Sequence, residues 1–166
     1  MELRHIAYPR QTVLITSEAE VTLMGKKVEK KNIMTMSWSM PVSFEPWMYA
    51  IAVNDECLSL ELIRKSKVFC VNFMPIELKN NVLYCGRNSG RTKDKFKETG
   101  LKEEECEKIH CPRIKKALAY LECEVAEEIK AGDHFVFIGN VVNAKIKKEG
   151  NRVFHKGGDK FTTTID

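Results

Sequence analysis

Residues 32–41 alternate between two kinds of side chain, and this alternation constrains the fold more than any other feature of the chain. From 34 to 40, even positions carry large apolar groups and odd positions carry hydroxyls, namely Met34, Met36, Trp38 and Met40 against Thr35, Ser37 and Ser39. Successive side chains of an extended strand point to opposite faces of a sheet. The segment therefore predicts a strand with one apolar face and one row of hydroxyls.

Two interpretations of the hydroxyl row are open at this point. A row of hydroxyls beside methionines and a tryptophan suits a flat aromatic ligand with polar edges, such as a flavin. An edge strand with one solvated face explains the same pattern without any ligand. The choice between a ligand-facing row and a solvated edge strand depends on the other segments of the chain.

The composition is that of a single globular domain covering residues 1–166. The chain carries 27 basic and 23 acidic residues in interleaved order, with a net charge of +4, and it has no basic run typical of nucleic-acid binding. No apolar run approaches membrane-spanning length, and the first residues lack the apolar core of a signal peptide. We therefore expect a cytoplasmic protein that binds neither nucleic acid nor membrane.

Short strand-like segments dominate the chain, and helices are inserted among them rather than alternating with them. Strands are expected at 12–16, 21–23, 32–41, 47–53, 68–73, 118–126 and 134–147, and helices at 59–65, 77–84 and 93–98, with an irregular tail after Gly150. This order favours a mainly β fold, a small antiparallel barrel with helical insertions, over a doubly wound parallel sheet. Neither of the common Gly-rich nucleotide-binding loops is present.

Three polar segments could bind an anion or cover a site. Residues 86–96 combine glycines with four cations, which suits a phosphate, although a solvated loop leading into a helix is an open alternative. The turn at 54–59 leads into a helix that Ser59 can cap, and a helix N-terminus can also hold phosphate. The glycine-rich tail at 155–161 either folds over a site or lies on the surface.

Six cysteines are scattered without Cys-x-x-Cys pairs, which in a cytosolic chain indicates reduced thiols. Only Cys106, His110 and Cys111 could suggest a metal site, but their spacing departs from that of zinc ligands and no second pair follows. We predict no metal and leave the role of these three residues open. Since no local set of nucleophile, acid and base can be recognised, the chemistry is expected to come from a bound cofactor.

Together these segments resemble the flavin reductase-like family, which includes the flavoredoxins. The matching stretches follow the family's order over nearly the whole chain: 32–38 with 41–43 and Pro46, 59–66, 69–73, 85–96, 132–134 with 138–139, and the Gly157-Gly158 tail. The resemblance implies the FMN-binding split barrel, a six-stranded antiparallel β-barrel with helical insertions. It also implies a homodimer that holds FMN non-covalently at or near the subunit interface.

The resemblance further assigns residues of this chain to the FMN site. Those expected along the flavin ring and its edge are Thr35, Met36, Ser37, Trp38, Pro9 and Arg10. Those expected around the phosphate are Asn54, Ser59, Ser89, Arg91 and Lys95. His155 and Phe161 of the tail complete the predicted set, and no side chain is predicted to act as a catalytic acid or base.

The function implied by the resemblance is the transfer of electrons from NAD(P)H to flavin or to a downstream acceptor. NAD(P)H would then be a transient co-substrate of a flavin oxidoreductase. A non-enzymatic FMN electron carrier of the flavoredoxin kind, reduced by a protein partner, is the alternative. The sequence distinguishes neither the electron donor nor the final acceptor, which could be a small molecule or a protein.

Overall fold

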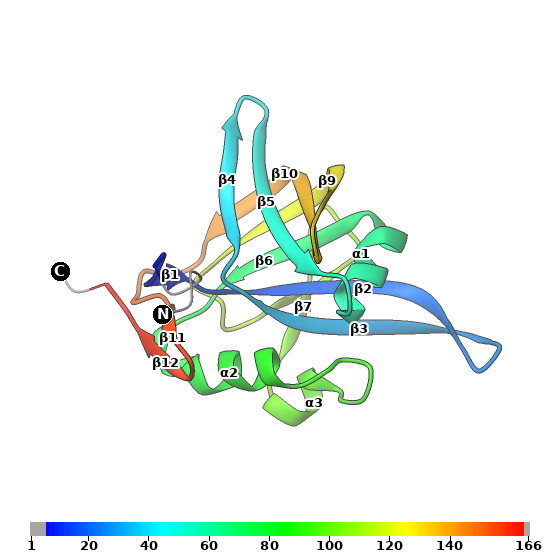
Figure 1. Ribbon diagram of the computed structural model, residues 1–166, viewed down its shortest axis with the longest axis horizontal. Helices are drawn as coiled ribbons and strands as arrows, with labels where there is room; N and C mark the ends of the chain where they lie inside the picture. Colours follow the sequence, from blue (N-terminus) through cyan, green and yellow to red (C-terminus); the bar gives the residue numbers. More distant parts are fainter. Residues whose placement is uncertain (1–5, 165–166) are drawn as a thin grey trace.

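A seven-stranded antiparallel sheet forms the body of the molecule (Figure 1). The computed structural model describes residues 6–164, the side chain of Leu23 excepted. The strand order is β3-β2-β6-β9-β10-β5-β4. The strands are β2 (Val13–Leu23), β3 (Lys26–Met36), β4 (Ser39–Phe44), β5 (Trp47–Asn54), β6 (Val68–Phe73), β9 (Ala119–Ala131) and β10 (His134–Ile146).

The sheet closes on itself because its two terminal strands are consecutive in the chain. β3 and β4 stand at opposite ends of the strand order, yet only Ser37 and Trp38 separate them. The amide of Ala52 in β5 donates to the carbonyl oxygen of Trp38 at 2.9 Å, so the linker already takes part in the pairing with β5. A sheet whose first and last strands are joined in this way is a barrel that is split between them.

The predicted antiparallel split barrel is confirmed, and the strand count depends on residues 32–41. The sequence pattern treats this segment as one strand, whereas the structure divides it between β3 and β4. Met36 still pairs with Val13 of β2, and Ser39 already pairs with Ile51 of β5. Counting β3 and β4 as one bent strand gives the six strands expected.

Two sequence-based boundaries were wrong because polar residues turned out to be extended. The expected strands at 12–16 and 21–23 are one continuous strand, in which Glu18 pairs with Lys31 and Glu20 with Glu29 of β3. The tail contains a hairpin of β11 (Phe154–Gly157) and β12 (Lys160–Thr162). This hairpin pairs with β1 (Arg10–Gln11), so the tail and the N-terminal segment form one small sheet.

Helices cover part of the barrel and mark where the candidate site lies. They are α1 (Leu58–Ser66), the 3-10 turn η2 (Ile76–Leu78), α2 (Lys79–Arg87) and α3 (Lys95–Thr99). The side chain of Asp94 accepts a hydrogen bond from the Lys97 amide at 3.1 Å and so caps α3, which ends at Gly100 with φ of 68° as its position in the sequence predicted. Ser59 is not the cap of α1, because the helix begins after Cys57 and buries Ser59 completely.

Apolar residues fill both sides of the strands that carry the site. The barrel interior is built on side chains such as Ile15, Met36 and Phe69. On the opposite face of β2 and β3, Leu14 and Ile33 pack against α2 and its surroundings. Figure 1 shows α2 and α3 lying along this outer side of β3. Among residues 6–164, none of the helices has the length and apolar character needed to cross a membrane.

Candidate functional site

A cavity of about 560 Å³ lies along β3, where the barrel is split. Its walls come from five places: β3 and the linker after it, the turn into α1, the end of α2 with the following loop, the N-terminal segment, and the tail. The lining residues are Tyr8, Arg10, Asn32, Met34, Thr35, Met36, Ser37, Trp38, Ala52, Asn54, Glu56, Cys57, Leu58, Cys85, Gly86, Arg87, Asn88, Ser89, Gly90, Lys95, His134 and His155. This volume is within the range usual for small-molecule and cofactor sites.

The hydroxyl row of β3 faces this cavity, but its hydroxyls already have protein partners. Thr35 Oγ1 donates to the carbonyl oxygen of Val82 in α2 at 2.6 Å, and Ser37 Oγ lies 2.9 Å from Thr12 Oγ1. The alternating methionines, Met34 and Met36, are buried in the barrel core. The predicted separation into an apolar face and a hydroxyl face is therefore observed as far as Met36.

The backbone of β3 offers further polar groups to the cavity. β3 is the terminal strand of the sheet, so among the described residues it has a strand neighbour, β2, on one side only. Half of the N–H and C=O groups of such a strand point away from the sheet. The carbonyl oxygen of Ile33 is one of them, since it accepts from Lys95 Nζ at 2.8 Å, and the backbone groups of Thr35 share its orientation.

The residues of the predicted phosphate loop lie in different environments, and only some of them line the cavity. Ser89 lines the cavity, whereas Arg91 lies on the surface, where its Nη1 is 3.4 Å from Glu61 Oε2. Lys95 lines the cavity but is 5 % exposed, and its ammonium donates to the carbonyl oxygens of Ile33 and Cys85 at 2.8 and 2.7 Å. Burial lowers the pKa of Lys95, and the nearby Cys85 and Cys57 thiols oppose this shift only in part. Lys95 thus joins β3 to α2 and supplies positive charge beneath the cavity.

The turn into α1 presents a helix N-terminus to the cavity. Cys57 and Leu58 line it, and within residues 6–164 no side chain caps the helix there. Asn54 also lines the cavity, with its Oδ1 accepting from the Glu56 amide at 3.0 Å. Unpaired N–H groups at the start of a helix favour an anion, although the carboxylate of Glu56 nearby opposes one.

Ser59 lies behind the cavity wall rather than in it. Its hydroxyl accepts from Asn32 Nδ2 at 2.9 Å, in a fully buried contact between α1 and β3. The loop after α2 packs on the same asparagine, since a Cβ placed on Gly90 would lie 2.1 Å from Asn32 Oδ1. Asn32 therefore holds α1, β3 and the loop in fixed positions, and Gly90 is required for this close approach.

Aromatic rings surround the other end of the cavity. Trp38 lies over the ring of His134, with centroids 4.7 Å apart, and Tyr8 meets His155 edge-on at 4.8 Å. The guanidinium of Arg10 lies over the Tyr8 ring at 4.4 Å. These residues come from four different segments, so the N-terminal segment and the tail both help to enclose the cavity.

The remaining predicted residues lie next to this end. Phe161 contacts the ring of His155, with centroids 5.4 Å apart, and lines an adjoining cavity of about 260 Å³ that shares Thr35 and Ser37 with the first. Pro9 adjoins the lining residues Tyr8 and Arg10 without lining the cavity itself. His155 Nε2 lies 2.8 Å from the carbonyl oxygen of Gly158, so this nitrogen carries the proton.

Sequence reasoning missed several lining residues. Tyr8 and Arg87 belong to segments that were recognised, but nothing in their spacing indicates that they face a ligand. Arg87 forms an ion pair with Asp159 of the tail, which only the folded chain brings near. His134 follows a Gly-Asp turn that was among the matching stretches, and that turn was the available signal for it.

The structure separates the three residues that could have suggested a metal site. Among the residues described, the ligand atoms of His110 lie within 4.8 Å of those of Glu18 and Glu29, whereas Cys106, His110 and Cys111 do not form such a group. The imidazole is therefore directed at the β2–β3 hairpin. The two cysteines interact with each other and with Cys70 instead.

The fold and the cavity define a class of protein: a split barrel with a cavity along its terminal strand. A family model described as flavin reductase like domain matches residues 3–163. The chain belongs to this flavin reductase-like family.

Individual proteins agree with the family match. An uncharacterized protein of Archaeoglobus fulgidus is 35% identical over 136 residues, covering 82% of this chain and 72% of the relative. The flavoredoxin of Methanosarcina acetivorans superposes with a TM-score of 0.84 at 24% identity, covering 100% of this chain and 90% of that one. The flavin reductase PheA2 superposes with a TM-score of 0.77 at 27% identity over 100% of both chains.

Proposed function

We propose that this protein binds FMN non-covalently in the cavity along β3 and transfers electrons from NAD(P)H to flavin or to a downstream acceptor. The observation that carries the proposal is the division of one cavity into three chemically different parts. These are the open backbone edge of β3, the uncapped start of α1, and the aromatic rings around Trp38.

Each part suits a different portion of FMN. Outward-facing backbone groups of an edge strand can pair with the polar rim of a flavin ring. A helix N-terminus with Ser89 opposite it suits a phosphate, and the buried charge of Lys95 favours an anion nearby. Aromatic side chains give a flat ring an apolar surface, and they limit the access of water to it. The donor set therefore fits the cofactor.

Bound FMN would supply the redox chemistry, because none of the lining side chains can accept a hydride. The protein's own contribution is binding and orientation. Thr35 and Ser37 hold β3 against α2 and against Thr12, which keeps the edge strand fixed before any ligand arrives. A rigid, preorganised site costs little rearrangement when it binds.

A homodimer is the second part of the proposal, and the β4–β5 hairpin supports it. This hairpin projects from the barrel in Figure 1. It exposes Met40, Val42 and Phe44 by 60%, 40% and 96%. Apolar side chains gathered on one projection are typical of a surface that another chain covers. Trp38 directly precedes β4, so a partner seated here would lie beside the cavity.

Six thiols without a disulfide fit the proposed cytoplasmic location.

The test begins with a titration of the purified protein by FMN and by riboflavin. We expect FMN to bind and riboflavin to bind at least about tenfold more weakly, since charge-assisted hydrogen bonds to phosphate contribute about 1.5–3 kcal/mol each. Equal affinities would contradict the phosphate site, and no binding of either would refute the proposal.

Steady-state oxidation of NADH and NADPH with free FMN then separates the reductase from a carrier: turnover supports the reductase, and no turnover with either nucleotide favours an electron carrier.

A further inference from the structure

Cys106 and Cys111 lie directly opposite each other on a hairpin remote from the cavity. The strands β7 (Glu103–Glu105) and β8 (Pro112–Ile114) pair antiparallel, with Glu105 opposite Pro112. The next pair in this register is Cys106 with Cys111, and the Cys106 amide donates to the Cys111 carbonyl oxygen at 3.1 Å. Residues that face each other in a hydrogen-bonded antiparallel pair have Cα atoms about 5.5 Å apart. That separation lies within the range of about 4.4–6.8 Å that disulfides span.

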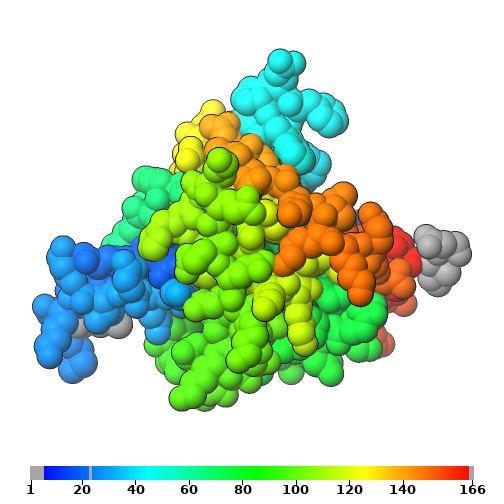
Figure 2. Space-filling model, turned by 180° about the vertical axis from the view of Figure 1, so that it is seen from behind, coloured from blue at the N-terminus to red at the C-terminus, as the bar shows by residue number. Residues whose placement is uncertain are grey.

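The three thiols at this place differ in exposure and in partners. Cys111 is fully buried, and its Sγ lies 3.3 Å from the carbonyl oxygen of Thr16. Cys70 of β6 is also fully buried, whereas Cys106 is only partly buried. Figure 2 shows the green to yellow-green part of the chain, which includes β7 and β8, spread over the face opposite to that of Figure 1. Cys106 is therefore the thiol of this cluster that solvent can reach.

The neighbours of Cys106 favour its thiolate form. Hydrogen bonds from the Cys111 and Cys70 thiols, together with the positive charge of Arg113, lower the pKa of Cys106 to about 5, against its burial and the charge of Glu122. Burial raises the pKa of Cys111 and of Cys70, so these two keep their protons and act as donors. A partly exposed thiolate beside a protonated thiol is the arrangement found in redox-active cysteine pairs.

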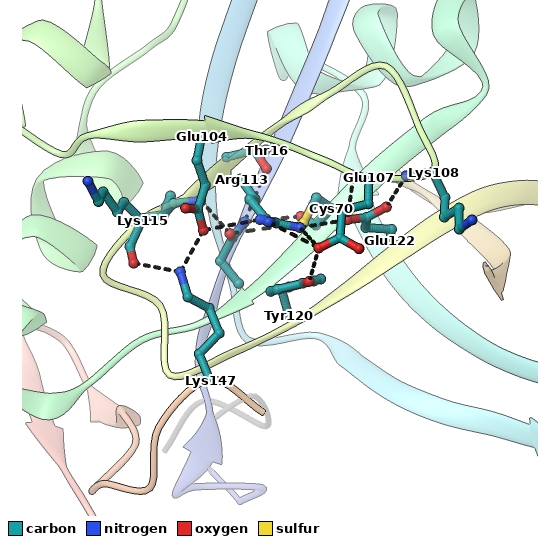
Figure 3. Close-up of polar contacts among 12 residues, drawn as sticks. Thr16, Cys70, Glu104, Glu107, Lys108, Arg113, Lys115, Tyr120, Glu122 and Lys147 are labelled. Atoms are coloured by element: carbon teal, nitrogen blue, oxygen red, sulfur yellow. Dashed lines mark hydrogen bonds and ion pairs between the residues drawn. The ribbon is translucent and has the colours of Figure 1, made fainter. Parts of the chain in front are cut away.

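A network of buried charges fixes the loop that carries Cys106 (Figure 3). The Glu122 carboxylate, 0% exposed, accepts from the amides of Glu107 and Lys108 at 2.9 and 2.7 Å. Arg113 Nη1 donates to the same carboxylate at 3.0 Å, and its guanidinium lies over the Tyr120 ring at 4.2 Å. The loop between the two cysteines is therefore anchored to β9, which holds Cys106 in register with Cys111.

We propose that Cys106 is a peroxide-reactive cysteine and that Cys111 is its resolving partner, so that the two form a reversible disulfide. The Cys106 thiolate attacks one oxygen of a hydroperoxide; the S–O bond forms, the O–O bond breaks, and hydroxide or alkoxide leaves. The Cys111 thiol then attacks the sulfenic sulfur, the S–S bond forms, and the sulfenic oxygen leaves as water with the thiol proton. The peroxide is reduced by two electrons, and an external dithiol returns the pair to thiols.

Cys111 rather than Cys70 is the resolving residue because the backbone of Cys70 is fixed in a strand, whereas that of Cys111 is not. Cys70 lies inside β6, paired on both sides, opposite Thr16 of β2 and Glu122 of β9. A bond from Cys70 to the loop would have to distort a central strand. Cys111 ends the same loop as Cys106, with four residues between them, so a disulfide there closes a short hairpin that is already formed.

The test is treatment of the purified wild-type protein with hydrogen peroxide at pH 7, followed by trypsin without reductant. Lys108 lies between the two cysteines, so cleavage there separates 103–108 from 109–113 unless a disulfide links them. We expect the linked pair of peptides, absent after reduction, as the first oxidation product. Cys57 serves as an internal control, since it too is partly buried but burial raises its pKa. The free thiol of Cys106 should disappear roughly tenfold faster than that of Cys57. The larger thiolate fraction of Cys106 speeds its reaction with peroxide, and the lower intrinsic nucleophilicity of a low-pKa thiolate offsets only part of this gain.

Variants then identify the two roles. Cys111→Ser should leave Cys106 as a sulfenic acid that dimedone traps, whereas Cys70→Ser should still give the linked peptides. A Cys106–Cys70 link, a Cys106 that reacts no faster than Cys57, or irreversible oxidation of Cys106 in the wild type would each overturn the proposal. The wild-type measurement decides the matter even if a variant fails to fold.

Discussion

The cavity along β3 and the network around Glu122 both gather polar groups against the barrel, but they use them in opposite ways. In the network, Glu122 is fully buried and each of its carboxylate oxygens accepts from the loop or from Arg113. In the cavity, the edge of β3 and the start of α1 face a shared volume of about 560 Å³. Hydrogen bonds satisfied within the protein stabilise a fold, whereas groups directed at a common space are available to a ligand.

The largest effect is expected from breaking the network. Arg113→Leu leaves the Glu122 carboxylate buried beside its two amide donors and should lower the free energy of unfolding by about 3 kcal/mol, as removal of one partner of a buried ion pair does. Urea denaturation followed by tryptophan fluorescence measures this loss. A loss below about 1 kcal/mol would show that water reaches the carboxylate and that the network resembles a surface ion pair.

Arg64 provides a matched control for that experiment. Its guanidinium also lies 4.2 Å from a ring centroid, that of Phe135, and also pairs with a carboxylate, that of Glu128. The difference is exposure, since the Arg64 side chain is 40% exposed and that of Arg113 12%. Arg64→Leu should therefore change the free energy of unfolding by less than about 1 kcal/mol.

A smaller loss is expected where the cavity wall itself depends on a buried charge. Lys95→Met removes the donor to two carbonyl oxygens, those of Ile33 and Cys85, and should lower the free energy of unfolding by about 2 kcal/mol. FMN affinity should fall as well, because β3 and α2 lose a connection. Arg91→Met, from the same loop, is the control and should cost less than about 0.5 kcal/mol, since its pair with Glu61 is exposed. Equal losses in the two variants would contradict this distinction.

The aromatic end of the cavity should affect binding rather than stability. Trp38→Ala should weaken FMN binding by about tenfold, because a stacked aromatic contact contributes about 0.5–1.5 kcal/mol beyond the buried area. Fluorescence quenching of FMN measures the affinity. Trp47→Ala is a matched control, since Trp47 is 46% exposed and Trp38 42%, but only Trp38 lines the cavity. If both variants bind FMN equally and keep the same oligomeric state, the ring does not contact the ligand.

The smallest effect is expected from one hydroxyl of β3. Ser37→Val removes the contact with Thr12 and should change the free energy of unfolding by less than about 1 kcal/mol, while it perturbs the absorption spectrum of bound FMN. Ser39→Ala removes a comparable hydroxyl, which lies 3.1 Å from Tyr49 Oη and outside this cavity, so the spectrum should stay unchanged. An unperturbed spectrum in the Ser37 variant would place this hydroxyl away from the ring.

Local patterns predicted much of the fold. The alternation in 34–40 placed Met34 and Met36 in the core and Thr35 on the opposite face, although Trp38 and Met40 of the same pattern are exposed. Gly100 ended its helix as predicted. The errors occurred where local and tertiary preferences differ. The polar centre of β2 was read as a break, although it pairs in register with polar residues of β3. The tail was read as irregular, because the short strand β1 that it pairs with lies far away in the sequence.

The candidate site was predictable only in part, for a related reason. The sequence identified most of the segments that meet at the cavity, since hydroxyls, glycines and cations stand out in a linear pattern. It could not show that Lys95 turns its charge onto two carbonyl groups or that Arg91 reaches toward Glu61. A cation's role depends on which acceptor lies nearest in space, and that distance is set by the packing of α1, α2 and β3.

By itself the sequence determined which residues form strands with distinct faces, because side-chain periodicity is a local property, and the order of its motifs along the chain indicated the family. The tertiary structure alone decided which polar groups face a shared cavity and which satisfy one another. It also decided that Cys106 and Cys111 meet across a hairpin while His110 turns away from them. These outcomes depend on strand register and closure of the barrel, which join residues far apart in the chain.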